Sequence, residues 1–443
     1  MIKITDKQNC CGCSACAQAC PKQCIVMTAD EEGFLYPSVD ISKCINCNLC
    51  EKVCNELNPY NTRTPLKVIA AINPDEAVRL NSSSGGIFHS LAKSTIDAGG
   101  VVIGARFDQN WQVVIDYAED MKGVEAFMGS KYVQARIGNA YIEAKYFLEE
   151  GRKVLFSGTP CQVAGLNKFL RKQYENLLTV DIICHGTPSP KVWGKYLAET
   201  VTEINQISSI KFRNKSNGWK NFSFNLQYNS NDNTISLLSP FRDNLFMKAF
   251  LKDIILRPSC YNCKAKGCSS QSDITIADFW GIEKILPKMD DDKGTGMVLI
   301  NTDKGEKSIN GLQLHTKEVE YEAIKPLNPA CYQSAKKHPK REWFFKNLEK
   351  KSVAKLTRHA TRHTYRERLY LFKCKCKVRT KELLKGLRTC QYGGVRNKPN
   401  SAHISYIPNL ELPYKWKISS IKFRNKNKGW RQYQIEIVLT GNL

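Results

Sequence analysis

Two cysteine runs near the start of the chain constrain its fold more than any other feature. Residues 10–21 read Cys-x2-Cys-x2-Cys-x3-Cys-Pro, and the same cysteine spacing returns over residues 44–54. Three thiolates spaced in this way bind one 4Fe-4S cluster, and the fourth cysteine of the run binds a neighbouring cluster. The spacing therefore predicts a two-cluster module. The ligands predicted for one cluster are Cys10, Cys13, Cys16 and Cys54, and those for the other are Cys44, Cys47, Cys50 and Cys20.

A structural zinc site is the alternative for these cysteines. Zinc sites use four thiolates, usually as paired Cys-x2-Cys units, whereas eight cysteines in a repeated order favour two clusters. Cys11 and Cys24 are surplus to the eight, and we expect them to be packing residues. Asn55 stands where a second proline is usual, but it removes no ligand. Residues 1–60 are thus expected to form a dicluster ferredoxin domain.

The number of cysteines also bears on the cellular compartment. The chain has 443 residues and 19 cysteines, of which ten precede residue 55. Its N-terminus lacks the charged and apolar segments of a secretory leader, and no run approaches the roughly 18 apolar residues of a membrane span. We therefore expect a cytoplasmic protein. In that reducing compartment, clustered cysteines are metal ligands or redox groups rather than disulfides.

Most of the formal net charge of +24 is concentrated near the C-terminus. Residues 335–398 hold 21 Lys and Arg residues against four Glu residues. Because the excess lies in one stretch, it describes a tail, and we expect no nucleic-acid binding. Residues 341–356 mix aromatic residues with lysines, as helices at membrane surfaces do. A solvated tail and a peripheral membrane contact are both open, and the solvated tail is favoured.

A polar segment with two prolines, residues 58–65, predicts a domain boundary. Residues 66–330 alternate apolar runs and helical periods, with strands expected at 67–72, 101–107, 152–158 and 177–184 and a helix within 85–100. This order predicts an α/β domain. The fold class expected for the whole chain is α+β. Its parts are the ferredoxin-like module (1–60), an α/β domain in two segments (66–150 and 151–330) and a basic C-terminal extension (331–443).

One internal repeat lies outside the cysteine runs. Residues 418–430 match residues 207–219 at 11 of 13 positions, at an offset of 211 residues. Repeat architectures need three or more stacked units. Two short copies therefore predict a partial duplication within the C-terminal extension, and the sequence assigns it no function.

Five further cysteines lie in the central part of the chain. Cys161 and Cys184 each follow a predicted strand, where an α/β sheet presents its reactive edge. Cys260, Cys263 and Cys268 lie close together a little later. The spacing leaves two interpretations open. The first four cysteines could complete a third 4Fe-4S cluster, or the first two are ordinary buried cysteines and the last three form a zinc knuckle.

A serine-glycine loop, Asn-Ser-Ser-Ser-Gly-Gly at residues 81–86, directly precedes the predicted helix. Small residues there let backbone N-H groups approach a phosphate at the helix N-terminus, but a serine-rich N-cap is also an ordinary helix start. Lys131 is a candidate phosphate contact or a surface lysine. His185 is a proton donor or a structural side chain, and Asp273 and Asp278 either cap a strand or touch a cofactor.

Several longer segments carry a family resemblance: GSKYVQ (129–134), FSGTPCQVAGL (156–166), DIICHGTPS (181–189) and SDITIADFWGI (272–282). With the serine-glycine loop and the cysteine trio, they make residues 1–330 resemble the coenzyme F420 hydrogenase/dehydrogenase beta-subunit family, in the form with an N-terminal ferredoxin domain. The resemblance implies an FAD in the central domain, and a third 4Fe-4S cluster on Cys161, Cys184, Cys260 and Cys263 with Cys268 as a competitor. The candidate FAD contacts are Ser82, Ser83, Ser84, Gly85, Gly86 and Lys131.

The predicted function is that of an iron-sulfur flavoprotein oxidoreductase. A flavin exchanges hydride or single electrons, whereas each cluster carries one electron, so electrons are expected to pass between FAD and the clusters. The expected partners are ferredoxin or another redox subunit, together with a small-molecule substrate that the fold does not identify. The alternative is a non-enzymatic electron-transfer subunit that docks a catalytic partner.

Overall fold

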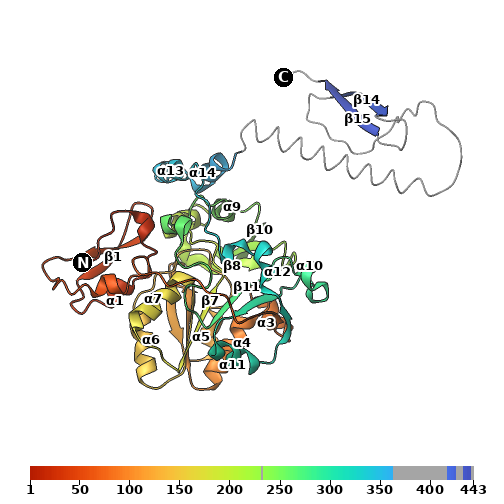
Figure 1. Ribbon diagram of the computed structural model, residues 1–443. Coiled ribbons are helices and arrows are strands. Elements are labelled where there is room, and N and C mark those ends of the chain that lie inside the picture. Colours follow the sequence, from red (N-terminus) through yellow and green to blue (C-terminus); the bar gives the residue numbers. More distant parts are fainter. Residues whose placement is uncertain (231–232, 363–416, 426–432, 441–443) are drawn as a thin grey trace. The chain divides into compact units, whose positions relative to one another are not determined.

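The computed structural model describes residues 1–230, 233–362, 417–425 and 433–440. The chain divides into two compact units, Met1–Arg362 and His363–Leu443, and each is described by itself. Figure 1 shows how the elements of the first unit are arranged. Within the described residues, no helix is long and apolar enough to cross a membrane.

The N-terminal segment consists of short elements around its cysteines: η1 (Lys7–Asn9), α1 (Ala15–Gln18), the antiparallel strands β1 (Ile25–Ala29) and β2 (Leu35–Val39), and α2 (Leu49–Lys52). Asp30 Oδ1 accepts hydrogen bonds from the backbone N-H groups of Glu32 and Phe34 and closes the hairpin turn. Gly33 has φ +86°, and a Cβ at this position would lie 2.4 Å from Lys191 Cβ. The turn therefore needs glycine both for its conformation and for its close packing on the central domain.

An eight-stranded mixed sheet forms the centre of the first unit, in the order β13-β3-β12-β11-β7-β6-β4-β5. The strands β4, β6, β7 and β11 are parallel neighbours, and the remaining pairs are antiparallel. The α/β class expected for the central domain is therefore confirmed, and the structure shows that its sheet is mixed. The strand bounds are β3 (Lys67–Ile72), β4 (Val101–Phe107), β5 (Val113–Ala118), β6 (Val154–Gly158), β7 (Leu177–Ile182), β11 (Ile274–Asp278), β12 (Gly296–Ile300) and β13 (His315–Val319).

Helices cover both faces of this sheet (Figure 1). Alternate residues of a strand point to opposite faces, so Val101 and Ile103 contribute to one core and Val102 to another. The first core contains α6 (Ala140–Glu149), α7 (Pro160–Leu170) and, from the N-terminal segment, Ala15 and Val53. The second contains α4 (Ile87–Asp97), α5 (Met121–Glu125) and α11 (Asp303–Asn310); α3 (Glu76–Asn81) precedes α4.

A second, three-stranded sheet has the order β10-β9-β8 and packs with helices around the buried Trp193. The sheet consists of β8 (Ile207–Asn214), β9 (Ser223–Ser230) and β10 (Asn233–Pro240), and the helices are α8 (Pro190–Ala198), α9 (Leu245–Leu251), α13 (Arg341–Lys346) and α14 (Val353–Ala360). The shorter elements are η2 (Ile204–Gln206), η3 (Pro258–Asn262), α10 (Ile282–Ile285), η4 (Pro287–Met289), α12 (Tyr321–Ile324), η5 (Lys325–Leu327) and η6 (Pro329–Cys331).

The basic extension begins as part of the folded unit. Phe344, Leu348, Val353 and Leu356 are buried in the core around Trp193. Arg341 forms an ion pair with Glu32 of the N-terminal hairpin, and both side chains are nearly inaccessible. Residues 341–360 are therefore packed against the body. For residues 341–356, the solvated tail and the membrane-surface helix are therefore both wrong, because the apolar side chains of this segment are buried in the core. The remainder of the basic stretch, from residue 363 on, lies outside the described residues, and a membrane contact through it stays a prediction.

The duplicated sequence forms the same kind of hairpin twice. In the second unit, β14 (Lys417–Asn425) pairs antiparallel with β15 (Tyr433–Thr440). Ile421 lies opposite Ile437, as Ile210 lies opposite Leu226 in the first copy. Both hairpins have a register irregularity at the same place, between residues 418 and 420 and between residues 207 and 209. Both copies of the repeated sequence therefore form the first strand of an antiparallel hairpin.

Candidate functional site

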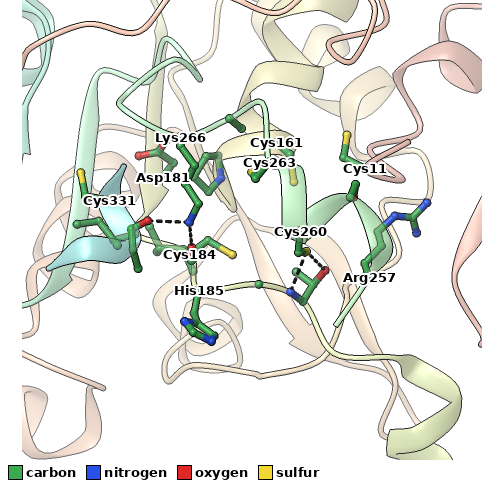
Figure 2. Close-up of a pocket in the computed structure, with 18 of the residues that line it drawn as sticks. Cys11, Cys161, Asp181, Cys184, His185, Arg257, Cys260, Cys263, Lys266 and Cys331 are labelled. Atoms are coloured by element: carbon green, nitrogen blue, oxygen red, sulfur yellow. Dashed lines mark hydrogen bonds between the residues drawn. The ribbon is translucent and has the colours of Figure 1, made fainter. Parts of the chain in front are cut away.

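A cavity lies where β6 and β7 end. Because these strands are parallel neighbours, the segments that follow them meet at one edge of the sheet. Segment 258–263 and η6 supply further walls. Figure 2 shows Cys331 at one side of the cavity and Cys11 and Arg257 at the other. Seven sulfur atoms line it, from Cys11, Cys161, Cys184, Cys260, Cys263, Cys268 and Cys331.

The first turn of α7 holds Cys161 in place. Thr159 is the N-cap, and its backbone N-H donates to Gln162 Oε1 at 2.8 Å in a capping box. Pro160 fits the first helical position because that position needs no N-H donor. Thr159 Oγ1 lies 3.3 Å from Cys161 Sγ. The strand-to-helix turn therefore presents this thiol to the cavity in a fixed direction.

Four of the cavity cysteines are the ligands predicted for the third cluster. They lie close enough together for each thiol to affect the pKa values of the others. Burial raises the pKa of Cys184, and the thiolates of the other three members raise it further. Burial, with Cys161 and Cys260 nearby, also raises the pKa of Cys263 to about 12. Each of the six pairs among the four thiols interacts in this way. The structure thus brings together Cys161, Cys184, Cys260 and Cys263, and Figure 2 shows them around the middle of the cavity.

Cys11 connects this group with the N-terminal cysteines. Its thiol lies close enough to Cys13 on one side and to Cys161 on the other for the three thiols to shift one another's pKa values. The interaction with Cys13 is the main cause that raises the pKa of Cys11. The sequence predicted only a packing role for this residue. It is indeed buried, but it also lies between one predicted ligand of the first cluster and one of the third.

Arg257 is a second connection, and sequence analysis did not single it out. Its guanidinium donates to the backbone oxygen of Cys10 at 2.7 Å and to that of Leu35 at 2.9 Å. Nη2 also lies 3.5 Å from Cys10 Sγ, and the side chain is 1% exposed. A lone arginine in the sequence gives no signal of such a position, because its contacts come from segments more than 100 residues away.

The two N-terminal cysteine runs lie against each other in an interleaved way. Burial, with Cys10 and Cys54 nearby, raises the pKa of Cys16 to about 12. Cys20 instead lines a second cavity with the later run and with the surplus Cys24, whose Sγ is 3.4 Å from Cys20 Sγ. The sulfurs from the later run in this cavity are those of Cys44, Cys47 and Cys50. Cys20 and Cys54 are thus each placed beside the other run, as the predicted assignment requires.

The described residues contain no group of three or more Cys, His, Asp or Glu side chains close enough to hold a single metal ion. The four thiolates of a cubane cluster each bind a different iron atom, and they need not converge on one point. All 16 cysteines among the described residues are free thiols.

The serine-glycine loop is a well-connected turn before α4. Ser83 Oγ accepts hydrogen bonds from Ser130 N at 2.7 Å and from Ser130 Oγ at 2.9 Å, which joins the loop to the GSKYVQ segment. Ser82 Oγ donates to Val78 O, and Ser84 Oγ donates to Thr295 O. A Cβ on Gly85 would lie 2.4 Å from Ala71 O. Gly86 is the N-cap of α4 with φ +84°.

Several cationic side chains surround this loop. Lys131 Nζ donates to Met128 O at 3.0 Å and to Gly129 O at 3.1 Å, and burial lowers the pKa of Lys131 to about 7. Lys215, which the sequence did not indicate, donates to Ser84 O at 2.9 Å and has its pKa lowered to about 7, chiefly by burial. Arg213 lies close enough to Lys215 to affect that pKa, and its buried Nε has no hydrogen-bond partner among the described residues.

The weaker candidates have structural partners. Asp278 forms a buried ion pair with Arg213 at 2.6 Å. Asp273 accepts hydrogen bonds from the backbone and hydroxyl of Thr179, and its Oδ1 accepts one from Thr302 Oγ1. His185 Nε2 lies 2.5 Å from Asp253 Oδ1. Asp181, a residue that the sequence did not indicate, lines the cavity, and burial raises its pKa to about 6.

The mixed α/β fold and the buried sulfur-lined cavities indicate an iron-sulfur redox protein. Residues 151–326 match the family model for the C-terminal part of the beta subunit of coenzyme F420 hydrogenase/dehydrogenase. The resemblance of this segment to that beta-subunit family, first indicated by its motifs, is therefore confirmed. The matched segment contains Cys161, Cys184, Cys260 and Cys263.

Two further proteins are similar to parts of the chain. An uncharacterized ferredoxin of Methanocaldococcus jannaschii is 39% identical over 51 residues, which are 12% of this chain and 65% of the ferredoxin. Less than two thirds of that protein is therefore matched. A chain of the F420-reducing [NiFe] hydrogenase complex from Methanosarcina barkeri is 16% identical with a TM-score of 0.41, over 61% of this chain and 88% of the other.

Proposed function

We propose that this chain is a cytoplasmic iron-sulfur flavoprotein oxidoreductase that passes electrons between FAD and three 4Fe-4S clusters. The observation that carries the proposal is the continuity of sulfur groups from Cys13 through Cys11 to Cys161. In this proposal, residues 1–60 are the dicluster ferredoxin domain and residues 66–330 hold FAD and the third cluster. A small molecule is the substrate, and ferredoxin or another redox subunit is the electron partner.

The sulfur sets fit clusters in their chemistry. Each set provides four thiols, which are the ligands that 4Fe-4S clusters require. Backbone N-H groups point at ligand sulfurs: Thr187 N donates to Cys260 Sγ at 3.4 Å, and Ile2 N donates to Cys50 Sγ at 3.3 Å. Such hydrogen bonds and nearby charges set the potential of a cluster. When bound, the clusters supply one-electron transfer.

The serine-glycine loop and its cations fit a dinucleotide phosphate. An anion beside this loop would meet the N-terminus of α4 and the positive groups of Lys131, Lys215 and Arg213. The unpaired Nε of Arg213 is a buried donor for which the described residues supply no acceptor. FAD, when bound, supplies two-electron exchange with a substrate. Ser82, Ser83, Ser84, Gly85, Gly86 and Lys131 remain the residues proposed to hold it.

Three exposed apolar side chains of the N-terminal module support a redox partner there. Ile41 is 73% exposed, Ile45 is 57% exposed and Val26 is 63% exposed, and Cys47 is the exposed member of its ligand set. Apolar surface of this kind beside a cluster suits a transient electron-transfer contact. These side chains favour a redox partner if the chain is an enzyme. They favour one equally in the alternative, in which the chain is a non-enzymatic subunit that docks a catalytic partner.

Iron, sulfide and flavin analysis of anaerobically purified protein separates the two functions. Three clusters correspond to about 12 iron atoms per chain, with one FAD. Cys184→Ser is expected to leave about eight iron atoms and to retain FAD, whereas the control Cys11→Ser is expected to keep about 12. Eight iron atoms without flavin in the parent protein would reject the enzyme proposal and leave the electron-transfer subunit.

A further inference from the structure

A fifth sulfur lies in the N-terminal cavity that contains the four ligands predicted for the second cluster. Cys24 lines this cavity with Cys20 and with the later cysteine run, and its Sγ lies 3.4 Å from Cys20 Sγ. The residue is 5% exposed. A 4Fe-4S cluster takes four thiolates, so one of the five sulfurs stays without iron. The cysteine spacing assigns Cys20 as the ligand and leaves Cys24 over.

The backbone around Cys24 holds it beside Cys20. Within the turn that joins the two cysteines, the backbone N-H of Gln23 donates to Cys20 O at 3.0 Å. Gln23 has φ +49°, a left-handed conformation that is uncommon for a residue with a Cβ and that reverses the chain here. Cys24 directly precedes β1, and its backbone oxygen accepts a hydrogen bond from Asp40 N at 2.8 Å, directly after β2. The turn and the hairpin therefore both fix the position of Cys24.

The contact between the two sulfurs has only one possible direction once the cluster is bound. Two free thiols at this distance could each donate to the other. A cysteine that binds iron does so as a thiolate and carries no proton. With Cys20 on iron, the only S-H of the pair is that of Cys24, and it donates to Cys20 Sγ. The buried Cys24 thiol is therefore a hydrogen-bond donor to a ligand sulfur.

The first cluster has a side-chain donor of its own. Arg257 Nη2 lies 3.5 Å from Cys10 Sγ, and Cys10 belongs to the ligand set of the first cluster. Hydrogen bonds to ligand sulfurs help to set the potential of a cluster, because they stabilise the additional negative charge of its reduced state. Arg257 and Cys24 therefore act on different clusters, and their effects on the two potentials are separable.

We propose that Cys24 raises the midpoint potential of the second N-terminal cluster by donating a hydrogen bond from its thiol to Cys20 Sγ. The inference rests on the proposed function, since it requires the two N-terminal clusters. A higher potential favours residence of the electron on the cluster whose ligand Cys47 is exposed, which is where a protein partner can reach it. Cys24 is a positioning residue, because it binds no iron and acts through Cys20.

Redox titration of the full-length, cluster-containing protein tests this hydrogen bond. Cys24→Ala removes the donor. Because a thiol is a weak donor, the variant is expected to make reduction of one cluster threefold to tenfold less favourable, a fall of about 30 to 60 mV for a one-electron couple. The iron content is expected to stay that of the parent protein. Cys24→Ser keeps an O-H donor and is expected to restore most of the lost potential.

Two comparisons and one spectroscopic signature assign the shift to the donor. Ile25→Val removes a methyl group from the same buried core as Cys24 and changes no donor, so it is expected to leave every potential unchanged. Arg257→Gln is expected to shift a different cluster from the one that Cys24→Ala shifts. In electron nuclear double resonance of the reduced protein, one exchangeable proton coupled to the cluster is expected to be absent from Cys24→Ala and present in Cys24→Ser.

Three results would overturn the proposal. The first is an unchanged set of potentials in Cys24→Ala at full iron content. The second is an equal shift in Cys24→Ala and Cys24→Ser, which would assign the effect to the lost sulfur and not to a donor. The third is loss of about four iron atoms from Cys24→Ala, which would make Cys24 a ligand. Absence of iron from the parent protein would instead reject the proposed function, so the two failures are distinguishable.

Discussion

Arg257 has the widest set of contacts of any single residue in the site. It holds the backbone of Cys10 and Leu35, donates to Gln134 Oε1 at 3.0 Å, and lies over the ring of Tyr36 at 4.3 Å. All four partners lie more than 120 residues away in the sequence. The buried guanidinium therefore fixes the N-terminal module on the central domain and places a positive charge beside a predicted cluster ligand.

The charge of Arg257 leads to a prediction about potential. A nearby positive charge stabilises the reduced, more negative state of a cluster, so Arg257→Gln is expected to lower the midpoint potential of the Cys10 cluster by on the order of tens of millivolts. A redox titration followed by electron paramagnetic resonance measures this shift. Arg257→Lys keeps the charge and is expected to stay close to the parent value. The exposed Arg242→Gln is the control, and an unchanged potential in Arg257→Gln contradicts the prediction.

Lys131 leads to a prediction about pH. Burial holds its pKa at about 7 in the folded protein, against 10.5 for an ordinary lysine. The unfolded chain therefore binds more protons between these values, and the free energy of unfolding rises with pH across that window. Lys131→Met removes the cost of burying the charged amine. It is expected to raise the melting temperature of flavin-free protein near pH 7, with a gain that shrinks toward pH 10.

A matched lysine makes this measurement specific. Lys122 is exposed on the neighbouring helix α5, and Lys122→Met is expected to change the melting temperature by an amount that does not vary with pH. A gain from Lys131→Met that stays constant from pH 7 to pH 10 would contradict the prediction, because it would show that the pKa of Lys131 is the same in the folded and the unfolded chain.

At the scale of the elements, the serine-glycine loop packs so closely on the sheet that few substitutions can be accommodated in it. A Cβ on Gly85 would meet Ala71 O of β3 at 2.4 Å and Gly296 N of β12 at 2.5 Å. Both contacts are backbone atoms of central strands, which cannot move aside easily. Gly85→Ala is therefore expected to destabilise the fold by about 1–3 kcal/mol and to reduce flavin retention. Denaturant unfolding and the flavin-to-protein ratio measure the two effects.

Gly311→Ala is the control for that substitution. A Cβ there would only reach ordinary contact, at 3.7 Å from Lys307 O, and the residue has φ −78°. It is expected to leave the free energy of unfolding within about 0.5 kcal/mol of the parent value. Equal effects of the two substitutions would mean that the loop is not tightly packed on the sheet.

Much of the local structure was predictable from the sequence. The strands expected at 67–72 and 101–107 are β3 and β4, and the helix expected within 85–100 is α4. These predictions are confirmed because each rests on a local apolar pattern. The order of strands in the sheet was not predictable, since β12 pairs with β3 across more than 220 residues. Such a pairing depends on which distant segments bury each other's apolar faces.

At the scale of the whole molecule, the division into two units leads to the last prediction. The elements up to α14 share cores with the central domain, and the compact unit ends at Arg362. A chain that ends at Arg362 is therefore expected to keep the iron and flavin content of the full-length protein, and its melting temperature within a few degrees. Loss of iron from this shortened chain would show that the second unit supports the first.

The sequence by itself predicted the two N-terminal ligand sets, and it determined the kind of domain that follows them. Cysteines two or three residues apart are brought together by a single turn of backbone, so their spacing carries the information. Only the tertiary structure decided that Cys11 lies beside both Cys13 and Cys161 and that Arg257 reaches Cys10. These contacts join segments far apart in the chain, and the packing of the cores, which no local pattern encodes, brings them together.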